Sequence, residues 1–132
     1  MRSAVLMSLT FAVVIVASGV AEAHHSYAEF RDTLTTIEGV LTTAVFANPH
    51  TILTVRAADG TVYKATWNAG FQLASMGVKT TELKAGDVLA ITGFPQRDPK
   101  MHELAKLRTV RRLTDGWTWK MENGRVTVTA AH

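Results

Sequence analysis

The hydrophobic pattern of the chain centres on residues 35–50, a stretch rich in β-branched and aromatic side chains that predicts one long strand. Its apolar positions keep one face up to Leu41 and change phase after the Thr42-Thr43 pair. Because side chains along a strand alternate strictly between two faces, this change of phase predicts a β-bulge. A straight strand of this length would project from a domain of this size, so we expect it to bend at Gly39 and at the bulge.

The rest of the chain predicts further strands, one short helix and a terminal hairpin. Apolar alternation and turn dipeptides predict strands over 51–57, 61–67, 88–94 and 102–113, a short helix over 71–76, and hairpin strands over 117–121 and 125–129. This mainly β order is that of an OB-like, five-stranded, partly open Greek-key barrel with one short helix and a C-terminal β-hairpin. A simple antiparallel meander sandwich is the alternative.

The first 23 residues carry a different pattern. Arg2 supplies a positive charge, residues 4–16 form a mostly apolar run, and Ala21 and Ala23 are small residues at the two positions that determine cleavage. This pattern predicts a secretory signal peptide over residues 1–23. The apolar run is shorter than the roughly 20 residues of a membrane span, although a retained anchor is the alternative.

Cleavage after the signal peptide leaves residues 24–132, which we expect to form one domain with residues 114–132 as a hairpin extension. The predicted location is the periplasm or the extracellular medium, without a membrane span. The formal net charge is +3, a basic excess too weak to indicate a nucleic-acid partner. The chain has no cysteine, which excludes disulfides and a catalytic thiol.

Several short motifs occur in order along the chain. They are Ala23-His24-His25-Ser26, Gly39, Asn48-Pro49-His50, and the segment L-K-A-G-D-V-L-A-I-T-G-F over Leu83–Phe94. Together they resemble a family of small exported bacterial proteins known as a domain of unknown function. The resemblance extends from His24 to Leu113 and implies a small periplasmic β-barrel with no assigned activity. The chain departs from the family pattern at Arg111-Arg112 and in its Trp-containing tail.

The histidines are the main candidates for chemistry. Cleavage makes His24 the N-terminal residue, and the α-amine and imidazole of a terminal histidine can chelate one metal ion. Because such nitrogen ligands suit Cu(II), we predict a copper site at His24 completed by His25, His50 or His102. His50 and His102 are expected at one rim of the barrel. Adventitious binding by the terminal amine and its neighbouring histidines, or no relevant metal, are the alternatives.

Two tryptophans in the predicted hairpin, Trp117 and Trp119, lie two residues apart and therefore share one face. They either cover the open end of the barrel or form an exposed patch that binds an envelope protein. The basic residues of the strand over 102–113 are expected on a solvated outer face, with binding of an anionic lipid or polymer as the alternative. They are Lys106, Arg108, Arg111 and Arg112.

Other functions have less support in the sequence. Tyr63 and Trp67 lie where OB barrels bind nucleic acid or saccharide, but they share a face with Ala65 and are expected in the core. Glu82 and Asp87 flank a turn, and no catalytic motif is present. We therefore predict a non-catalytic binding module, with copper as the preferred ligand. The alternative is an envelope interaction or structural module that uses the Trp-containing hairpin.

Overall fold

A computed structural model describes residues 28–132 of the chain. The predicted signal peptide, its cleavage site, and the candidate ligands His24 and His25 lie outside the described residues. Within residues 28–132, no helix has the length and apolar character that crossing a membrane requires.

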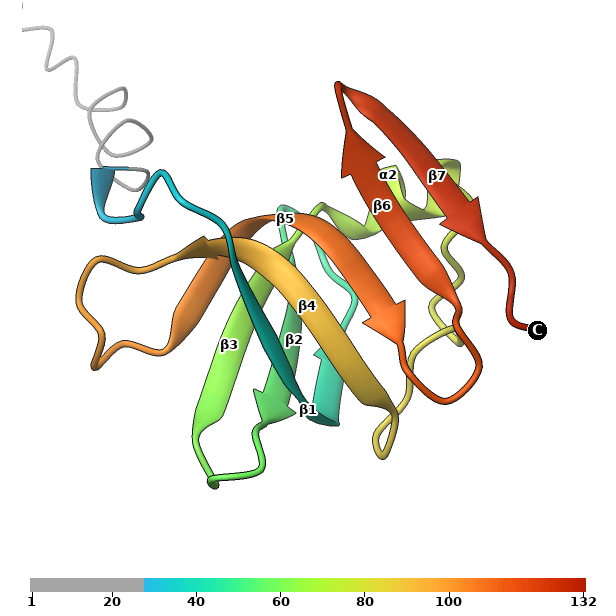
Figure 1. Cartoon of the computed structure of the whole chain (residues 1–132). Helices are drawn as coiled ribbons and strands as arrows, with labels where there is room; N and C mark the ends of the chain where they lie inside the picture. The colour runs from blue at the N-terminus through green and yellow to red at the C-terminus, as the bar shows by residue number, and fades with distance from the viewer. Residues whose placement is uncertain (1–27) are drawn as a thin grey trace, which may run out of the picture.

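The described chain forms seven strands and one named helix, arranged as a closed barrel with a hairpin extension (Figure 1). The elements are β1 (Thr35–Val45), β2 (Thr51–Arg56), β3 (Val62–Trp67), α2 (Gly70–Ser75), β4 (Val88–Pro95), β5 (Glu103–Arg112), β6 (Thr118–Glu122) and β7 (Arg125–Thr129). Most of these bounds lie within two residues of the predicted ones, which is the usual spread for element ends.

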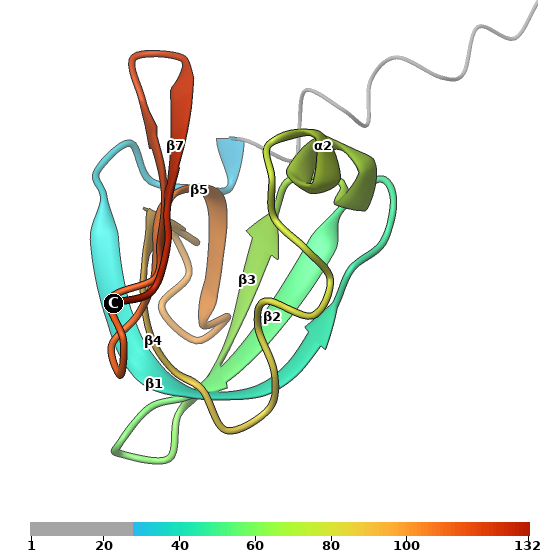
Figure 2. The ribbon, with the colours of Figure 1, turned by 90° about the vertical axis from the view of Figure 1, so that its right-hand side faces the viewer.

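The strand order confirms the OB-like barrel and excludes the meander sandwich. The strands lie in the order β3-β2-β1-β4-β5-β6-β7, and β3 also pairs with β5. That pairing is parallel and short, with Lys64 opposite Glu103 and Ala65 opposite Leu104. Since it joins the two ends of the five-stranded part, it closes the barrel, and the β6–β7 hairpin continues outward from β5 (Figure 2).

Strand β1 curves around the barrel and pairs with two neighbouring strands, β2 and β4 (Figure 2). It pairs with β4 up to Val40 and with β2 from Val40 onward. The register with β2 shifts between Leu41 and Thr43, which confirms the predicted bulge. A Cβ at Gly39 would clash with the backbone carbonyl of Arg56, so this glycine is required where β1 changes partner.

The predicted end of this strand was wrong. β1 stops at Val45 rather than at residue 50, because β2 is its antiparallel neighbour and begins at Thr51. Residues 46–50 therefore have to form the connection between the two strands. This connection carries His50 to the end of the barrel that α2 covers.

The core lies inside the barrel and extends under the hairpin. Its largest buried side chains include Trp67 and Trp119, whose rings meet edge to face with centroids 5.2 Å apart. Leu73 of α2 is also fully buried, so the helix closes one end of the barrel. The expectation that Trp67 belongs to the core is confirmed.

Candidate functional site

A groove of about 730 Å³ opens beside the end of β3, within the range of roughly 300–1,000 Å³ that is typical of ligand sites. The two strands that close the barrel stay paired only as far as Ala65 and Leu104, and the groove lies beyond this point. Its lining residues come from six segments of the chain and are Phe30, Pro49, His50, Thr66, Trp67, Asn68, Ala69, Phe71, Gln72, Ala105, Lys106, Leu107, Arg108 and Met121.

An irregularity in β5 shapes one wall of the groove. Thr92 of β4 pairs with Thr109, but Phe94 pairs with Ala105, so β5 carries additional residues between these two pairs. Lys106 lies within this irregular segment and has a positive φ of 48°. Gly93 faces the segment, and a Cβ there would lie 2.8 Å from the Leu107 side chain. The irregular segment therefore packs tightly on β4.

The opposite wall is held by contacts between α2 and the β1–β2 connection. The backbone N–H of Gly70 donates to the carbonyl of Ala47 at 2.8 Å, and that of Phe71 donates to Oδ1 of Asn48 at 3.2 Å. These bonds fix the start of the helix beside the loop that carries His50. Phe71 is 65% exposed, which is unusual for a phenylalanine and leaves its ring at the rim.

The floor of the groove is apolar and its charged edge is cationic. Trp67 and Leu107 are each 2% exposed and form part of the floor. None of the lining residues is acidic, whereas Lys106 and Arg108 are basic. The groove therefore combines apolar surface with positive charge.

In the described part of the chain, the guanidinium of Arg108 contacts an aromatic ring and a thioether sulfur, and no charged group. Its guanidinium carbon lies 5.4 Å from the centre of the Phe94 ring, and Nη1 lies 3.5 Å from Sδ of Met121. Among the ion pairs of residues 28–132, none includes Arg108. Half-buried arginines usually have a carboxylate partner, and Arg108 has none among the described residues. Its guanidinium is therefore able to bind an anion.

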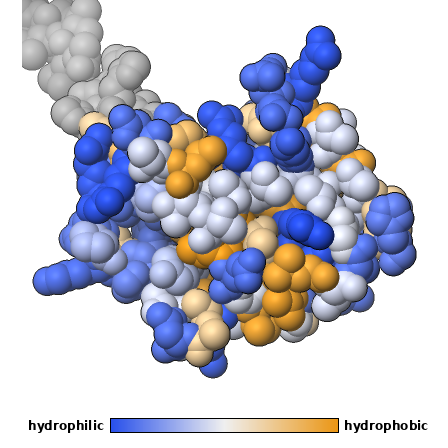
Figure 3. Space-filling view, in the orientation of Figure 1, coloured by the Kyte–Doolittle hydropathy of each residue, from blue (hydrophilic) through white to orange (hydrophobic). Residues whose placement is uncertain are grey.

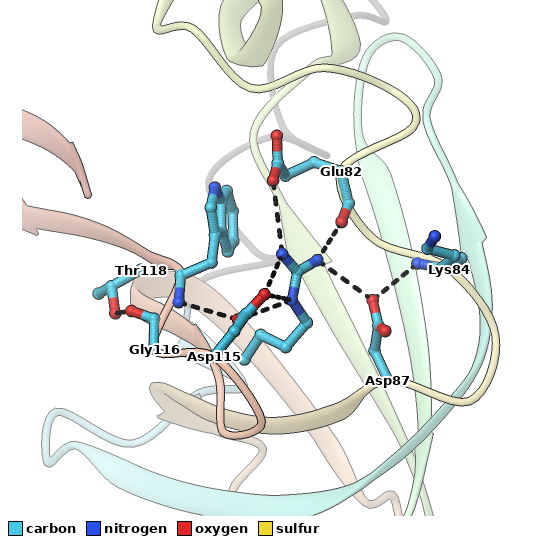
Figure 4. A network of polar contacts seen from close by, with 8 residues as sticks. Glu82, Lys84, Asp87, Asp115, Gly116 and Thr118 are labelled. Carbon is cyan, nitrogen blue, oxygen red and sulfur yellow. Dashed lines mark hydrogen bonds and ion pairs between the residues drawn. The ribbon is translucent and has the colours of Figure 1, made fainter. Parts of the chain in front are cut away.

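A second arginine of β5, Arg112, is surrounded by carboxylates instead, and Figure 4 labels these as Glu82, Asp87 and Asp115. Its side chain is 11% exposed, and its nitrogens lie 3.6 Å from Glu82, 3.5 Å from Asp87 and 2.8 Å from Asp115. It also donates to the backbone carbonyl of Glu82 and lies over the ring of Trp117, 5.8 Å from its centre.

The contacts of Arg112 connect the loop before β4, the end of β5 and the turn into β6. The hydrogen bond to Asp115 raises the pKa of Arg112, and the same bond lowers the pKa of the Asp115 carboxyl. The expectation that Arg112 belongs to a solvated outer face was therefore wrong. The reason is that Glu82 and Asp87, which are distant in sequence, converge on it together with the nearby Asp115.

The two candidate histidines within the described residues lie apart. His50 lines the groove and precedes Thr51, which pairs with Trp67 at the end of β3. The backbone carbonyl of His102 instead accepts a hydrogen bond from Lys64, near the start of β3.

The predicted gathering of His50 and His102 at one rim was thus wrong, because β5 begins beside the start of β3 and the β1–β2 connection lies beside its end. The ring of His102 packs edge to face against Tyr63 instead, with centroids 5.5 Å apart. Residues 28–132 contain no cluster of three or more side chains suited to hold a metal ion.

Trp117 and Trp119 are 2% and 0% exposed. Their burial agrees with the alternative that they cover the barrel, and it leaves neither side chain at the surface for a partner. Interaction through the hairpin would therefore have to use its other residues or its backbone.

Sequence reasoning missed most of the groove. Phe71 looked like an ordinary helix residue, and Arg108 like one of several solvated cations. One signal was available: Leu104 and Ala105 are consecutive apolar residues before Lys106 and Leu107, which breaks the period of two as the Thr42-Thr43 pair does. That break marks the irregular segment that brings Arg108 to the groove.

Together these features define a small OB-like β-barrel with a hairpin extension and an apolar groove that carries positive charge. The chain belongs to DUF6152, a family of unknown function whose model matches residues 12–109. No curated protein matches the chain. The family match confirms the resemblance seen in the sequence motifs and ends within β5, so Arg112 and the β6–β7 hairpin lie outside it.

Proposed function

We propose that this protein is an exported, periplasmic, non-catalytic binding module whose ligand occupies the groove. The observation that carries the proposal is the cation of Arg108, which borders an apolar floor and has no carboxylate partner within residues 28–132. A partly desolvated cation gains most from an anionic hydrogen-bond acceptor.

The chemistry of the walls indicates the class of ligand. The exposed ring of Phe71 offers apolar contact beside a floor that includes the buried Trp67 and Leu107, and Arg108 offers a planar set of donors. The ligand that fits is a small amphipathic anion with an aromatic or aliphatic body and one carboxylate, sulfonate or phosphate group.

A fluorescent aromatic sulfonate, 8-anilinonaphthalene-1-sulfonate, tests this proposal. We expect Arg108→Gln to weaken its binding about 10- to 100-fold, because a hydrogen bond to a charged group contributes about 1.5–3 kcal/mol. Arg111→Gln is the matched control, since Arg111 is exposed on the same strand and does not line the groove.

The uncharged probe N-phenyl-1-naphthylamine separates charge recognition from apolar contact. It should bind the wild type and Arg108→Gln alike and should bind Phe71→Ala more weakly. If the two arginine variants bind the sulfonate equally well, the groove is not an anion site.

A copper site is the second candidate function, and one observation favours it. Phe30, near the start of the described residues, lines the same groove as His50. His24 precedes Phe30 by six residues, which can span about 20 Å when extended. We propose that the α-amine and imidazole of His24 bind Cu(II), with His50 or His25 as a third nitrogen ligand.

Titration with Cu(II) tests this site on protein that begins at His24. An additional N-terminal Met should weaken binding at least tenfold, and His50→Ala should weaken it less. His102→Ala is the matched control and should have no effect, since His102 lies at the other end of β3. Equal and weak binding by all four proteins would remove the site from consideration.

Export is the remaining part of the proposal and rests on the signal-peptide pattern of residues 1–23. Expression of the full chain followed by cell fractionation should place the protein in the periplasm. N-terminal sequencing should then begin at His24. Protein that remains in the cytoplasm, or that keeps residues 1–23, would contradict it.

A further inference from the structure

The outer edge of β7 has no neighbouring strand in the described structure. β7 stands last in the strand order and pairs only with β6. No backbone hydrogen bond outside the hairpin involves residues 125–129 within the described part of the chain. The hairpin rises from the barrel in both ribbon views (Figures 1 and 2), so this edge is open to solvent.

The turn of the hairpin determines which backbone groups face that edge. The two strands are joined at Asn123-Gly124, and Glu122 pairs with Arg125 directly beside the turn. In a hairpin with such a turn the flanking pair exchanges hydrogen bonds, and the bonding alternates from there on. The N–H and C=O groups of Arg125, Thr127 and Thr129 therefore point toward β6.

It follows that the N–H and C=O groups of Val126 and Val128 point outward along the open edge. Proteins usually protect such edges with a proline, a bulge or an inward-pointing charge. β7 has the sequence R-V-T-V-T, with no proline, and its register with β6 is regular throughout. The edge is thus ready to accept another strand.

The sequence of β7 is complementary to itself when two copies run antiparallel around Thr127. Val126 then lies opposite Val128 of the other copy, and both residues have their hydrogen-bonding groups directed across the contact. Arg125 lies opposite Thr129 of the other copy, so no like charges face each other. We propose that two copies of this protein associate through their β7 edges about a two-fold axis at Thr127.

The physical gain comes from pairing the open edge of the sheet. β6 is already paired with β5 through residues 118–120, whereas the backbone groups along the outer edge of β7 have no strand partner. Pairing would join the sheets of the two copies in the order β5-β6-β7-β7-β6-β5 and would extend the half-buried row of Val126 and Val128. The tip of the hairpin is hydrophilic in Figure 3, so backbone bonds would supply most of the contact. A contact of this size predicts weak association, in the range of about 10 µM to 1 mM.

Two substitutions with the same charge should change this association in opposite directions. Thr127→Glu places two carboxylates opposite each other at the two-fold axis, yet within the hairpin it faces Lys120 and keeps the monomer intact. Thr129→Glu places each carboxylate opposite Arg125 of the other copy. Both residues are exposed, and both substitutions lower the net charge by one.

Sedimentation equilibrium of protein purified after expression of the full chain measures the dimer dissociation constant. We expect Thr127→Glu to raise it at least tenfold and Thr129→Glu to lower it about two- to fivefold. A wild type that is monomeric at about 1 mM overturns the proposal. So does a dimer that the two variants affect in the same direction, because another surface would then form it.

Amide hydrogen exchange measured by NMR tests the predicted edge directly. The amides of Val126 and Val128 should exchange at least tenfold more slowly at high than at low protein concentration. The amide of Thr127 bonds within the hairpin and should be independent of concentration. Concentration-independent exchange at all three positions would overturn the assignment of the edge.

Discussion

Two arginines four residues apart on β5 illustrate how the same side chain serves two purposes in one small barrel. Arg112 is surrounded by three carboxylates and an indole ring, and its charge is compensated within the chain. Arg108 contacts a phenyl ring and a thioether sulfur, which compensate no charge. Burial with counter-charges stabilises a fold, whereas a cation without them is left for binding.

The difference arises from the irregular segment of β5 around Lys106. Within this segment, at residues 105–108, the strand borders the groove, where none of the lining residues is acidic. After it, the strand runs beside β4 again and ends next to the turns that carry Asp87 and Asp115. The comparison therefore predicts a structural role for Arg112 and a binding role for Arg108.

The largest expected effect is the loss of stability in Arg112→Ala. Removing this cation leaves three carboxylates close together without compensation, and breaking such a pair costs about 3–5 kcal/mol when it is fully buried. Because these carboxylates are partly exposed, we expect a loss of about 2–3 kcal/mol in the free energy of unfolding, measured by urea denaturation.

Arg112→Lys is the control for charge alone. Lysine keeps the positive charge but cannot bind several carboxylates in one plane, so its stability should lie between those of the wild type and Arg112→Ala. If Arg112→Ala unfolds at the same urea concentration as the wild type, the structural role assigned to Arg112 is wrong.

Gly93→Ala should disturb the irregular segment of β5 that places Arg108 beside the groove. The added methyl group would lie 2.8 Å from the Leu107 side chain and 3.0 Å from the carbonyl of Ala105, so the irregular segment must move. Overpacking of this kind costs about 1–3 kcal/mol. Urea denaturation and the sulfonate titration should show lower stability and weaker binding together. Unchanged binding would mean that the position of Arg108 does not depend on this contact.

Acid should weaken the ion pairs of Arg112 and leave the contacts of Arg108 unaffected. The pKa of Asp115 is lowered in the folded protein by its hydrogen bond to Arg112. Its contribution is therefore complete above the unfolded-state pKa of about 3.9 and is lost as the pH falls through the lower folded-state pKa. Between pH 7 and pH 3 the wild type should lose more stability than Asp115→Asn. An equal loss in both proteins would assign the acid sensitivity to other carboxyl groups.

The smallest expected change in stability is that of Arg108→Gln. The variant loses a cation–π contact with Phe94, which contributes about 0.5–1 kcal/mol at exposed sites. Its urea midpoint should stay close to that of the wild type while its sulfonate binding falls. A destabilisation as large as that of Arg112→Ala would end the distinction between the two residues.

Much of the barrel was predictable from local patterns. The bulge after Leu41 followed from a change of phase, and the turn at Asn123-Gly124 followed from its residues, because each depends only on neighbours in the chain. The family resemblance also rested on short local motifs and is confirmed by the match over residues 12–109. In contrast, the predicted rim with His50 and His102 required knowing which loops share one end of the barrel.

The alternation of apolar residues and the turn dipeptides by themselves determined the strands, their succession along the chain and the mainly β class of this protein, whereas the pairing of β3 with β5 that closes the barrel came from the tertiary structure. Only the tertiary structure decided which of four similar cations on β5 would be compensated and which would border a groove. The physical reason is that Coulombic pairing depends on distance in space. Glu82 and Asp87 reach Arg112 only because β4 pairs with β5 and places Leu89 opposite Arg112, which brings their loop beside the end of β5.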